Sequence, residues 1–405
     1  MNNLIRLGNA VKYSEERTSL RELSLDNFIT TDSILQNKGG ITIASNLPPV
    51  GNSFPSYKKD NILISNIRPY LKKIWYSDRD GGCSQDVLVL ELKNGYNPKF
   101  VYYSIFQDAF FVHMMRGKKG TKMPRGDKNQ ILDYLIPDYD FSTQQKIASV
   151  LSTFDSKISL NTRINAELEA LAKTIYDYWF VQFDFPDANG KPYKTSGGKM
   201  FWNKELKREV PEGWEVKKLR EFADTASGGT PLSTRIEYYE NGDIPWINSG
   251  ELNNPYIIET SNFITEIGLK NSSAKLFDPN TLLIALYGAT AGKVSLLQVQ
   301  ACTNQAICAI IDKSNIYTYF LKFSFGNLYK YLVNLSTGSA RDNLSQDMIK
   351  DLKFVIPPED LLITFNQIAN PIIKKISISL KENHYLSTLR DWLLPMLMNG
   401  QVKVG

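Results

Sequence analysis

The run DNILISNIRPY, residues 60–70, returns in altered form as NTLLIALYGAT, residues 280–290. Each run begins with a polar residue, continues through apolar or small residues and ends in a polar turn. A second pair follows in the same order, because CSQDVLVLEL at 83–92 and CTNQAICAII at 302–311 both lead from a cysteine and polar residues into an apolar run. The shared order and the separation of about 219 residues indicate an internal duplication.

The duplication continues through a glycine-containing loop into a long helix. GTKMPRGDKNQILDYLIP at 120–137 matches GSARDNLSQDMIKDLKFVIP at 338–357, and helical patterns follow at 143–180 and 363–398. Apolar residues in these patterns step alternately by three and four, which is typical of a coiled-coil seam. In the first helix the rhythm is expected to slip near Asn161 and then resume. Two ordinary core helices are the alternative.

The predicted fold class is α+β, with two similar mixed α/β domains separated by two long antiparallel coiled-coil helices in a pseudo-two-fold internal repeat. Short strands are expected at 61–66, 87–92, 281–286 and 306–311, and shorter helices at 102–115 and 317–332. The predicted boundaries are 1–142 for the first domain, 143–182 for the central helix, 183–210 for a linker rich in Gly, Lys and Pro, 211–360 for the second domain and 361–405 for the C-terminal helix. No match to PEGWEVKKL at 211–219 is found in the first copy, so its first strand is expected to be abbreviated.

Composition narrows the class of protein. The 405 residues are 42% hydrophobic and 22% charged, as in globular proteins. Three scattered cysteines argue against a disulfide framework, and two histidines argue against a histidine-rich metal site. No signal peptide or membrane helix is expected, and we expect a cytoplasmic protein. The net charge of +5 is concentrated in residues 116–128, which carry six basic residues and one acid. Such a loop suits a polyanion, although a solvated surface loop is the alternative.

The chain resembles the specificity subunit of type I DNA restriction-modification systems. The resemblance covers nearly the whole chain and rests on GKPYKTSGGKMFWNKELKREVPEGWEVKKL at 190–219, GDIPWINSGEL at 242–252 and TGSARDNLSQDMIKDLKFVIPP at 337–358. It implies two target-recognition domains that each read half of a split, asymmetric site in double-stranded DNA. It also implies two modification (methyltransferase) subunits as partners and, for cleavage, restriction subunits that translocate DNA and cut it. S-adenosylmethionine, ATP and Mg would then be bound by those partners, and this chain would not be a catalyst.

Candidate DNA contacts are polar, basic or aromatic residues of predicted turns and loops, because loops on a rigid platform can enter the major groove. In the first copy they are Asn66, Arg68, Gln85, Lys118, Lys119, Lys122 and Arg125. In the second copy they are Ser249, Tyr287, Thr290, Asn304, Gln305, Arg341 and Asn343. Because the two sets differ, the two halves are expected to read different base sequences. Candidate partner-binding residues on the long helices are Leu168, Leu171, Ile175, Trp179, Leu386, Leu389 and Trp392.

Three enzyme motifs are incomplete. GATAGKV at 288–294 has three residues between its glycines where a phosphate loop needs four. NPKF at 97–100 and NPYI at 254–257 lack the second proline of an adenine-binding loop, and a turn or a helix start is expected there. Asp86, Glu91 and Lys93 match a loose nuclease pattern, but on a strand residues 86 and 91 would face opposite sides. A restriction endonuclease fused to a recognition domain and a non-DNA coiled-coil scaffold remain the alternative functions.

Overall fold

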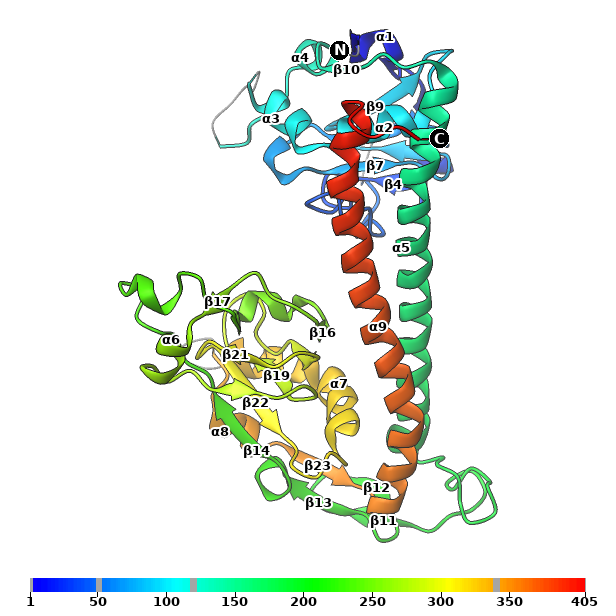
Figure 1. Ribbon diagram of the computed structural model, residues 1–405. Helices are drawn as coiled ribbons and strands as arrows, with labels where there is room; N and C mark the ends of the chain where they lie inside the picture. The colour runs from blue at the N-terminus through cyan, green and yellow to red at the C-terminus, as the bar shows by residue number, and fades with distance from the viewer. Residues whose placement is uncertain (1–2, 49–52, 117–121, 338–342, 405) are drawn as a thin grey trace. The chain divides into compact units, whose positions relative to one another are not determined.

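The computed structural model describes residues 3–48, 53–116, 122–337 and 343–404 (Figure 1). The chain divides into two compact units, one formed by Met1–Ser159 with His384–Gly405 and the other by Leu160–Asn383. Each unit therefore contains one globular domain together with part of both long helices. The domain boundaries expected from the sequence stay a prediction.

The first unit is built around two four-stranded sheets. One has the order β2-β9-β6-β7, with strands Val11–Tyr13, Val87–Leu92, Ile62–Ser65 and Ile74–Tyr76. The other has the order β3-β5-β8-β4, with strands Arg17–Thr18, Phe54–Tyr57, Gly81–Cys83 and Phe28–Ile29. The single helix expected at 102–115 is instead two helices, α2 (Pro98–Phe106) and α3 (Asp108–Arg116), because Gln107 between them has an extended backbone. Asn97 caps α2 by accepting a hydrogen bond from the Phe100 amide, so the Asn-Pro pair is a helix start.

The second unit repeats this arrangement with additions. Its larger sheet has the order β14-β22-β19-β20-β16, with strands Asp224–Ser227, Ile307–Ile311, Leu282–Ala285, Val294–Leu297 and Tyr256–Ile257. Its smaller sheet has the order β17-β15-β21-β18, with strands Phe263–Ile264, Ile244–Ile247, Ala301–Thr303 and Leu276–Phe277. A short helix, α6 (Glu266–Lys270), follows β17, and α7 (Thr318–Thr337), which ends five residues beyond the helix predicted at 317–332, packs against β19 and β20.

The internal duplication is present in the backbone. The central strands pair antiparallel in both copies, β6 with β9 and β19 with β22. Short helices α4 (Lys128–Leu132) and α8 (Gln346–Lys350) are capped by Asp127 and Ser345, which lie 218 positions apart. Each cap satisfies amide groups of the first turn, so the two loops end in the same way.

The first copy contains a counterpart of the strand in PEGWEVKKL, although no sequence match to that segment is found there. Strand β1 (Leu4–Arg6) pairs with β10 (Leu135–Pro137) just as β13 (Glu215–Lys218) pairs with β23 (Lys353–Ile356). The strand is shorter by one residue, as an abbreviated strand would be. The match was missed because LIRL and VKKL share a position in the sheet but little sequence.

The long helices are α5 (Phe141–Tyr176, 36 residues) and α9 (Glu359–Met398, 40 residues). They begin two and four residues earlier than predicted, and a π-helical turn, Asp177–Val181, follows α5 directly. In the first unit the Tyr139 hydroxyl donates to the Met398 carbonyl and Asp155 pairs with Arg390. In the second unit Asn161 bonds to Glu382, and Phe180 packs on Phe365. Because partner numbers fall along α9 as they rise along α5, the helices pair antiparallel.

The predicted slip in the α5 seam was wrong. Positions 147, 151, 154, 158, 161, 165, 168 and 172 are all buried or half-buried, and they continue the alternation of four and three without interruption. Asn161 and Asn165 are 4% and 8% exposed and occupy seam positions. A pattern of apolar residues alone suggests a slip, because the middle of this seam is occupied by the polar residues Asn161 and Asn165.

The segment that joins the two copies is folded. Strands β11 (Met200–Asn203) and β12 (Arg208–Pro211) form a hairpin. Phe183 and Val210 are buried in the core of the second unit, and the rings of Phe185 and Trp214 stack at 5.3 Å. The linker therefore belongs to the packed structure of the second unit.

Candidate nucleic-acid interface

In the first unit, backbone hydrogen bonds gather predicted contact residues at one end of the sheet. The Asn66 amide after β6 donates to the Asp86 carbonyl at 2.8 Å, and the Gly126 amide donates to the Asn66 carbonyl at 3.2 Å. The side chains of Arg125 and Asp86 form an ion pair at 2.9 Å. We call Asn66, Arg68, Gln85, Asp86 and Arg125 the first polar edge.

Most side chains of this edge reach solvent. Arg68, Gln85 and Arg125 are exposed, as is Lys122 in the preceding loop. Asn66 is half-buried, and its Oδ1 is buried without a hydrogen-bond partner among the described residues. The predicted contacts Lys118 and Lys119 lie outside the described residues.

Asp108 at the start of α3 ties together two loops of the first unit. Its carboxylate pairs with Lys72 at 2.6 Å and with Lys38 at 3.0 Å. The hydrogen bond from Lys72, assisted by Lys38, lowers the pKa of Asp108 below its ordinary value, although partial burial opposes this shift. The amide of Lys38 also donates to the carbonyl of Lys72, so both loops are held against α3.

The second unit has an equivalent edge with different side chains. The Leu344 amide donates to the Leu286 carbonyl at 2.8 Å, in the place of the bond from Gly126 to Asn66. Thr230 donates from its hydroxyl to Oε1 of Gln305 at 2.5 Å, and Asn304 donates from Nδ2 to Oδ1 of Asn248 at 3.3 Å. We call Thr230, Asn248, Asn304, Gln305 and Asn343 the second polar edge.

The predicted DNA contacts of the second unit differ in how far their side chains are exposed to solvent. Gln305 and Asn343 are exposed, and Ser249, Tyr287 and Asn304 are half-buried. The prediction that Thr290 contacts DNA is corrected, because Thr290 is only 4% exposed inside the turn between β19 and β20 and cannot present its side chain to DNA. Arg341 lies outside the described residues.

The loop that follows β14 was not predicted from the sequence. Gly228 and Gly229 bring this loop against Thr303, and a Cβ on Gly228 would lie 2.0 Å from the Thr303 carbonyl oxygen. Only glycine fits this approach. The turn-rich sequence GGTP at 228–231, which leads to Thr230, was a signal that could have found the loop.

The incomplete enzyme motifs take structural roles. GATAGKV forms the turn between β19 and β20, with positive φ at Gly288 and Gly292, and no helix follows it as in a phosphate loop. Asp86 pairs with Arg125, whereas Glu91 pairs with Lys12. Within the described ranges, no three His, Cys, Asp or Glu side chains gather as a metal site. No helix of the described chain is long and apolar enough to cross a membrane.

The predicted partner-binding residues divide into two groups. Leu171, Leu389 and Trp392 are 50%, 45% and 58% exposed, and Leu386 is half-buried. Leu168 and Ile175 are half-buried against the core of the second unit and Trp179 is 8% exposed in that core, and the partner-binding role of these three residues stays a prediction. Tyr385, 71% exposed on α9, was not predicted although it lies one helical turn before Leu389.

Comparison with known proteins identifies relatives along almost the whole chain. The profile of the family described as type I restriction modification DNA specificity domain matches residues 9–170 and 211–382. The MjaIX specificity subunit of Methanocaldococcus jannaschii is 29% identical over 77% of this chain and 71% of its own length. The HindI specificity subunit of Haemophilus influenzae is 27% identical over 93% of this chain and 94% of its own length. The crystal structure of a type I S subunit from M. genitalium shares the fold, with a TM-score of 0.61 at 16% identity over 98% of this chain and 96% of that one.

Proposed function

This chain belongs to the type I restriction modification DNA specificity family, and we propose from that membership that its two globular domains read the two halves of an asymmetric, bipartite DNA target. Specificity subunits recognise the DNA target and do not catalyse its modification. We call the globular domains of the first and second units the first and second recognition domains. The fold supports the proposal because each domain offers a polar edge at the end of a rigid sheet.

The difference between the two edges is the observation that carries the asymmetry. The first edge contains an exposed arginine, Arg125, paired with Asp86. Its counterpart 218 positions later is Asn343, beside the amides of Asn304 and Gln305. Arginine matches the two major-groove acceptors of guanine, whereas asparagine and glutamine match adenine. We therefore expect the two half-sites to differ in sequence.

The long helices are suited to setting the gap between half-sites. Each helix is unbroken and contributes residues to both units. A helix of 36 residues is about 54 Å long, or roughly one and a half turns of DNA. We infer that the length of the helix pair fixes the number of base pairs between the half-sites.

Exposed apolar positions on the long helices recur with the period of the duplication. Leu160 and Leu171 on α5 are 42% and 50% exposed, and Ile378 and Leu389, 218 positions later on α9, are 52% and 45% exposed. Single exposed apolar residues are common on protein surfaces, but recurrence at matching positions of both copies favours a shared role for these two rows. We infer that these two rows bind two modification subunits in the same way. S-adenosylmethionine, ATP and Mg would be bound by the modification and restriction subunits.

The proposed function is tested by mapping genomic methylation and then measuring binding of the complex to DNA. Genomic methylation in cells with and without this gene should reveal one bipartite motif that depends on the gene. The purified complex with its modification subunits should bind that duplex in preference to one with either half-site scrambled. Equal affinity for all three duplexes would contradict the proposal. Magnesium-dependent cleavage by this chain alone would favour a fused endonuclease, and absence of salt-sensitive DNA binding would favour a scaffold.

A further inference from the structure

A lysine, a tyrosine and a carboxylate form a buried cluster in the second unit. Lys322 on α7 pairs with Glu169 on α5, and Tyr256 on β16 donates its hydroxyl to the other oxygen of the same carboxylate. The side chain of Lys322 is only 7% exposed, and its ammonium group also lies 4.7 Å from the centre of the Tyr256 ring. Burial lowers the pKa of Lys322, and the charge of Glu169 opposes that shift.

This cluster is a second attachment point between the second recognition domain and α5. The first is an aromatic cluster at the end of α5, where Tyr176 and Phe180 pack against Phe320, and Tyr176 bonds to Ser324 at 2.8 Å. Glu169 lies seven residues before Tyr176, which is about 10 Å along the helix. Apolar contacts are non-directional, whereas an ion pair with a shared hydrogen bond has a defined geometry. Two points of attachment therefore fix the angle at which the domain meets α5.

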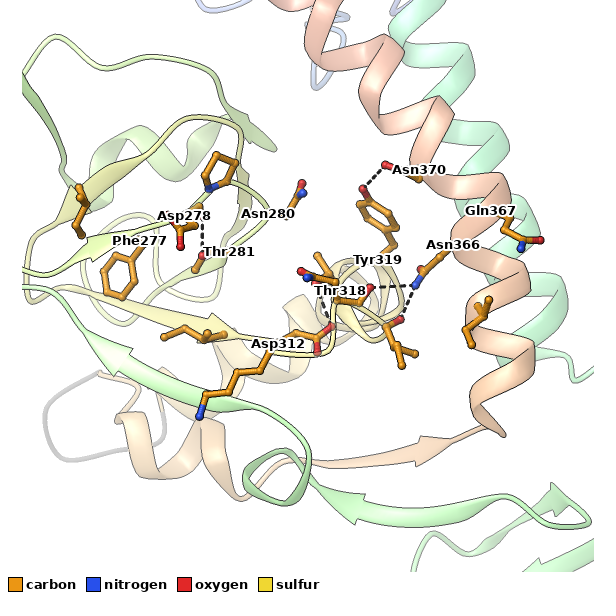
Figure 2. A pocket seen from close by; sticks show the side chains of 17 residues that line it. Phe277, Asp278, Asn280, Thr281, Asp312, Thr318, Tyr319, Asn366, Gln367 and Asn370 are labelled. Carbon is orange, nitrogen blue, oxygen red and sulfur yellow. Dashed lines mark hydrogen bonds between the residues drawn. The ribbon is translucent and has the colours of Figure 1, made fainter.

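The second recognition domain also packs against α9, where Leu362, Phe365, Ala369, Ile373 and Ile376 share the buried core of the unit with residues of α7. A cleft of about 850 Å³ is lined by the turn at 276–281, by residues at 311–319 and by residues of α9 (Figure 2). Tyr319 bridges it by donating to Oδ1 of Asn370 at 2.8 Å, and Asn366 donates to the Ile316 carbonyl at 2.8 Å. The domain is therefore attached to α9 as well, through apolar packing and these two hydrogen bonds.

The first unit contains a cluster of the same chemistry. Tyr103 on α2 donates its hydroxyl to Asp155 on α5 at 2.5 Å, and Arg390 on α9 pairs with the same carboxylate. The side chain of Arg390 is 12% exposed and lies 4.7 Å from the centre of the Phe106 ring. In both units a tyrosine of the domain and a mostly buried cation thus meet one carboxylate of α5. The two carboxylates lie 14 residues apart, or two heptads.

We propose that these two clusters, Tyr103–Asp155–Arg390 and Tyr256–Glu169–Lys322, are clamps that orient the recognition domains on α5 and so set how strictly the protein selects the gap between half-sites. The inference rests on the proposed function. The clamp residues are positioning residues and touch no DNA base. Loosening a clamp should leave the sequence of each half-site unchanged but let the domain tilt, so that targets with one base pair more or less become acceptable.

The experiment measures methylation of duplexes with the mapped half-sites and gaps of the natural length, one shorter and one longer, by the complex with its modification subunits. Tyr103→Phe and Tyr256→Phe each remove one hydroxyl and keep the ring, and Glu169→Gln removes the charge that holds Lys322. Each should reduce the preference for the natural gap about tenfold, equivalent to about 1.4 kcal/mol. Lys173→Gln is the matched control, because Lys173 lies on the same helix and pairs with Asp177 in the π-helical turn that follows α5. The control should keep the natural preference.

Two results would overturn the proposal that these clusters act as clamps. One is an unchanged gap preference in both tyrosine variants with normal thermal unfolding. The other is a changed half-site sequence with the gap preference intact, which would place these residues in base reading. Failure of the proposed function itself would look different, because the wild-type complex would then methylate neither the mapped target nor its gap variants. If Glu169→Gln fails to fold, the tyrosine variants decide the question alone.

Discussion

Asn161 of α5 and Asn383 of α9 are hydrogen-bonded inside the seam of the helix pair, with 2.9 Å between Nδ2 and Oδ1. The same amide donates to Oε2 of Glu382 at 2.7 Å. A polar pair in a coiled-coil seam is less stabilising than leucine, but it disfavours every shifted register in which it would be unpaired. The centre of the helix pair is thereby fixed in one register.

Asn165, the next seam residue, gives a sharp comparison with Asn161. Both atoms of its side-chain amide are buried without a hydrogen-bond partner in the described part of the chain. Asn165→Leu should therefore raise the free energy of unfolding by about 1 kcal/mol and the unfolding midpoint by about 2–4 °C. Asn161→Leu should lower both, because it replaces only one member of the polar pair and takes a donor away from Glu382 and Asn383. Calorimetry of the two variants checks this, and an equal rise in both would contradict the role given to Asn161.

Arg125 should contribute to base recognition in the first half-site. If it contacts guanine while Asp86 holds its guanidinium, Arg125→Ala should weaken binding by about 1–3 kcal/mol and relax the preference at a single base pair. Asp86→Asn should relax the base preference at the same position by a smaller amount. Competition binding with single-base variants of the target measures both effects. Arg79→Ala is the control, since Arg79 pairs with Asp78 after β7, at the opposite end of the strands. If Arg125→Ala weakens binding by the same amount for every base at that position, Arg125 contacts a phosphate group and not a base.

Substitution of the exposed Trp392 should affect assembly, whereas substitution of the buried Trp179 should affect stability. Trp392 is 58% exposed, so Trp392→Ala should change stability by less than about 0.5 kcal/mol but weaken assembly with the modification subunit. Trp179 packs on Phe180 and Phe365, so Trp179→Ala should cost about 3–5 kcal/mol of stability. Thermal unfolding and co-purification with the modification subunit separate the two effects. If the Trp392→Ala variant assembles fully with the modification subunit at limiting concentration, Trp392 is not part of that interface.

Acid should loosen the loops held by Asp108. Because its pKa is lowered in the folded state, its contribution is present above its ordinary pKa near 4 and is lost as pH falls through the lowered value. The side chain is 58% exposed, so the contribution is at most about 1 kcal/mol. The free energy of unfolding of Asp108→Asn should lie below the wild-type value at pH 7 and approach it toward pH 3. A constant difference over this range would show that the charge of Asp108 is not involved.

The sequence predicted the elements whose signal is local. The central strands near 62–65 and 307–311 and the long helices were found because apolar periodicity is a direct consequence of burial. The uninterrupted seam at Asn161 and the strand at Leu4–Arg6 were missed, because both depend on a partner distant in sequence. Among the candidate contacts, exposed Gln305 and buried Thr290 have similar polar side chains, and only the turn that surrounds Thr290 distinguishes them.

The spacing of 218 positions between the helix caps Asp127 and Ser345 recurs between Ile147 and Phe365 on the buried faces of α5 and α9. One added residue in this stretch would rotate everything beyond it by about 100° and turn the apolar face outward. The loops before the caps face no such restriction, because their length is not coupled to a helical phase. Insertions and deletions during evolution should therefore accumulate upstream of each cap, so that new DNA preferences arise while the frame of the helices is preserved.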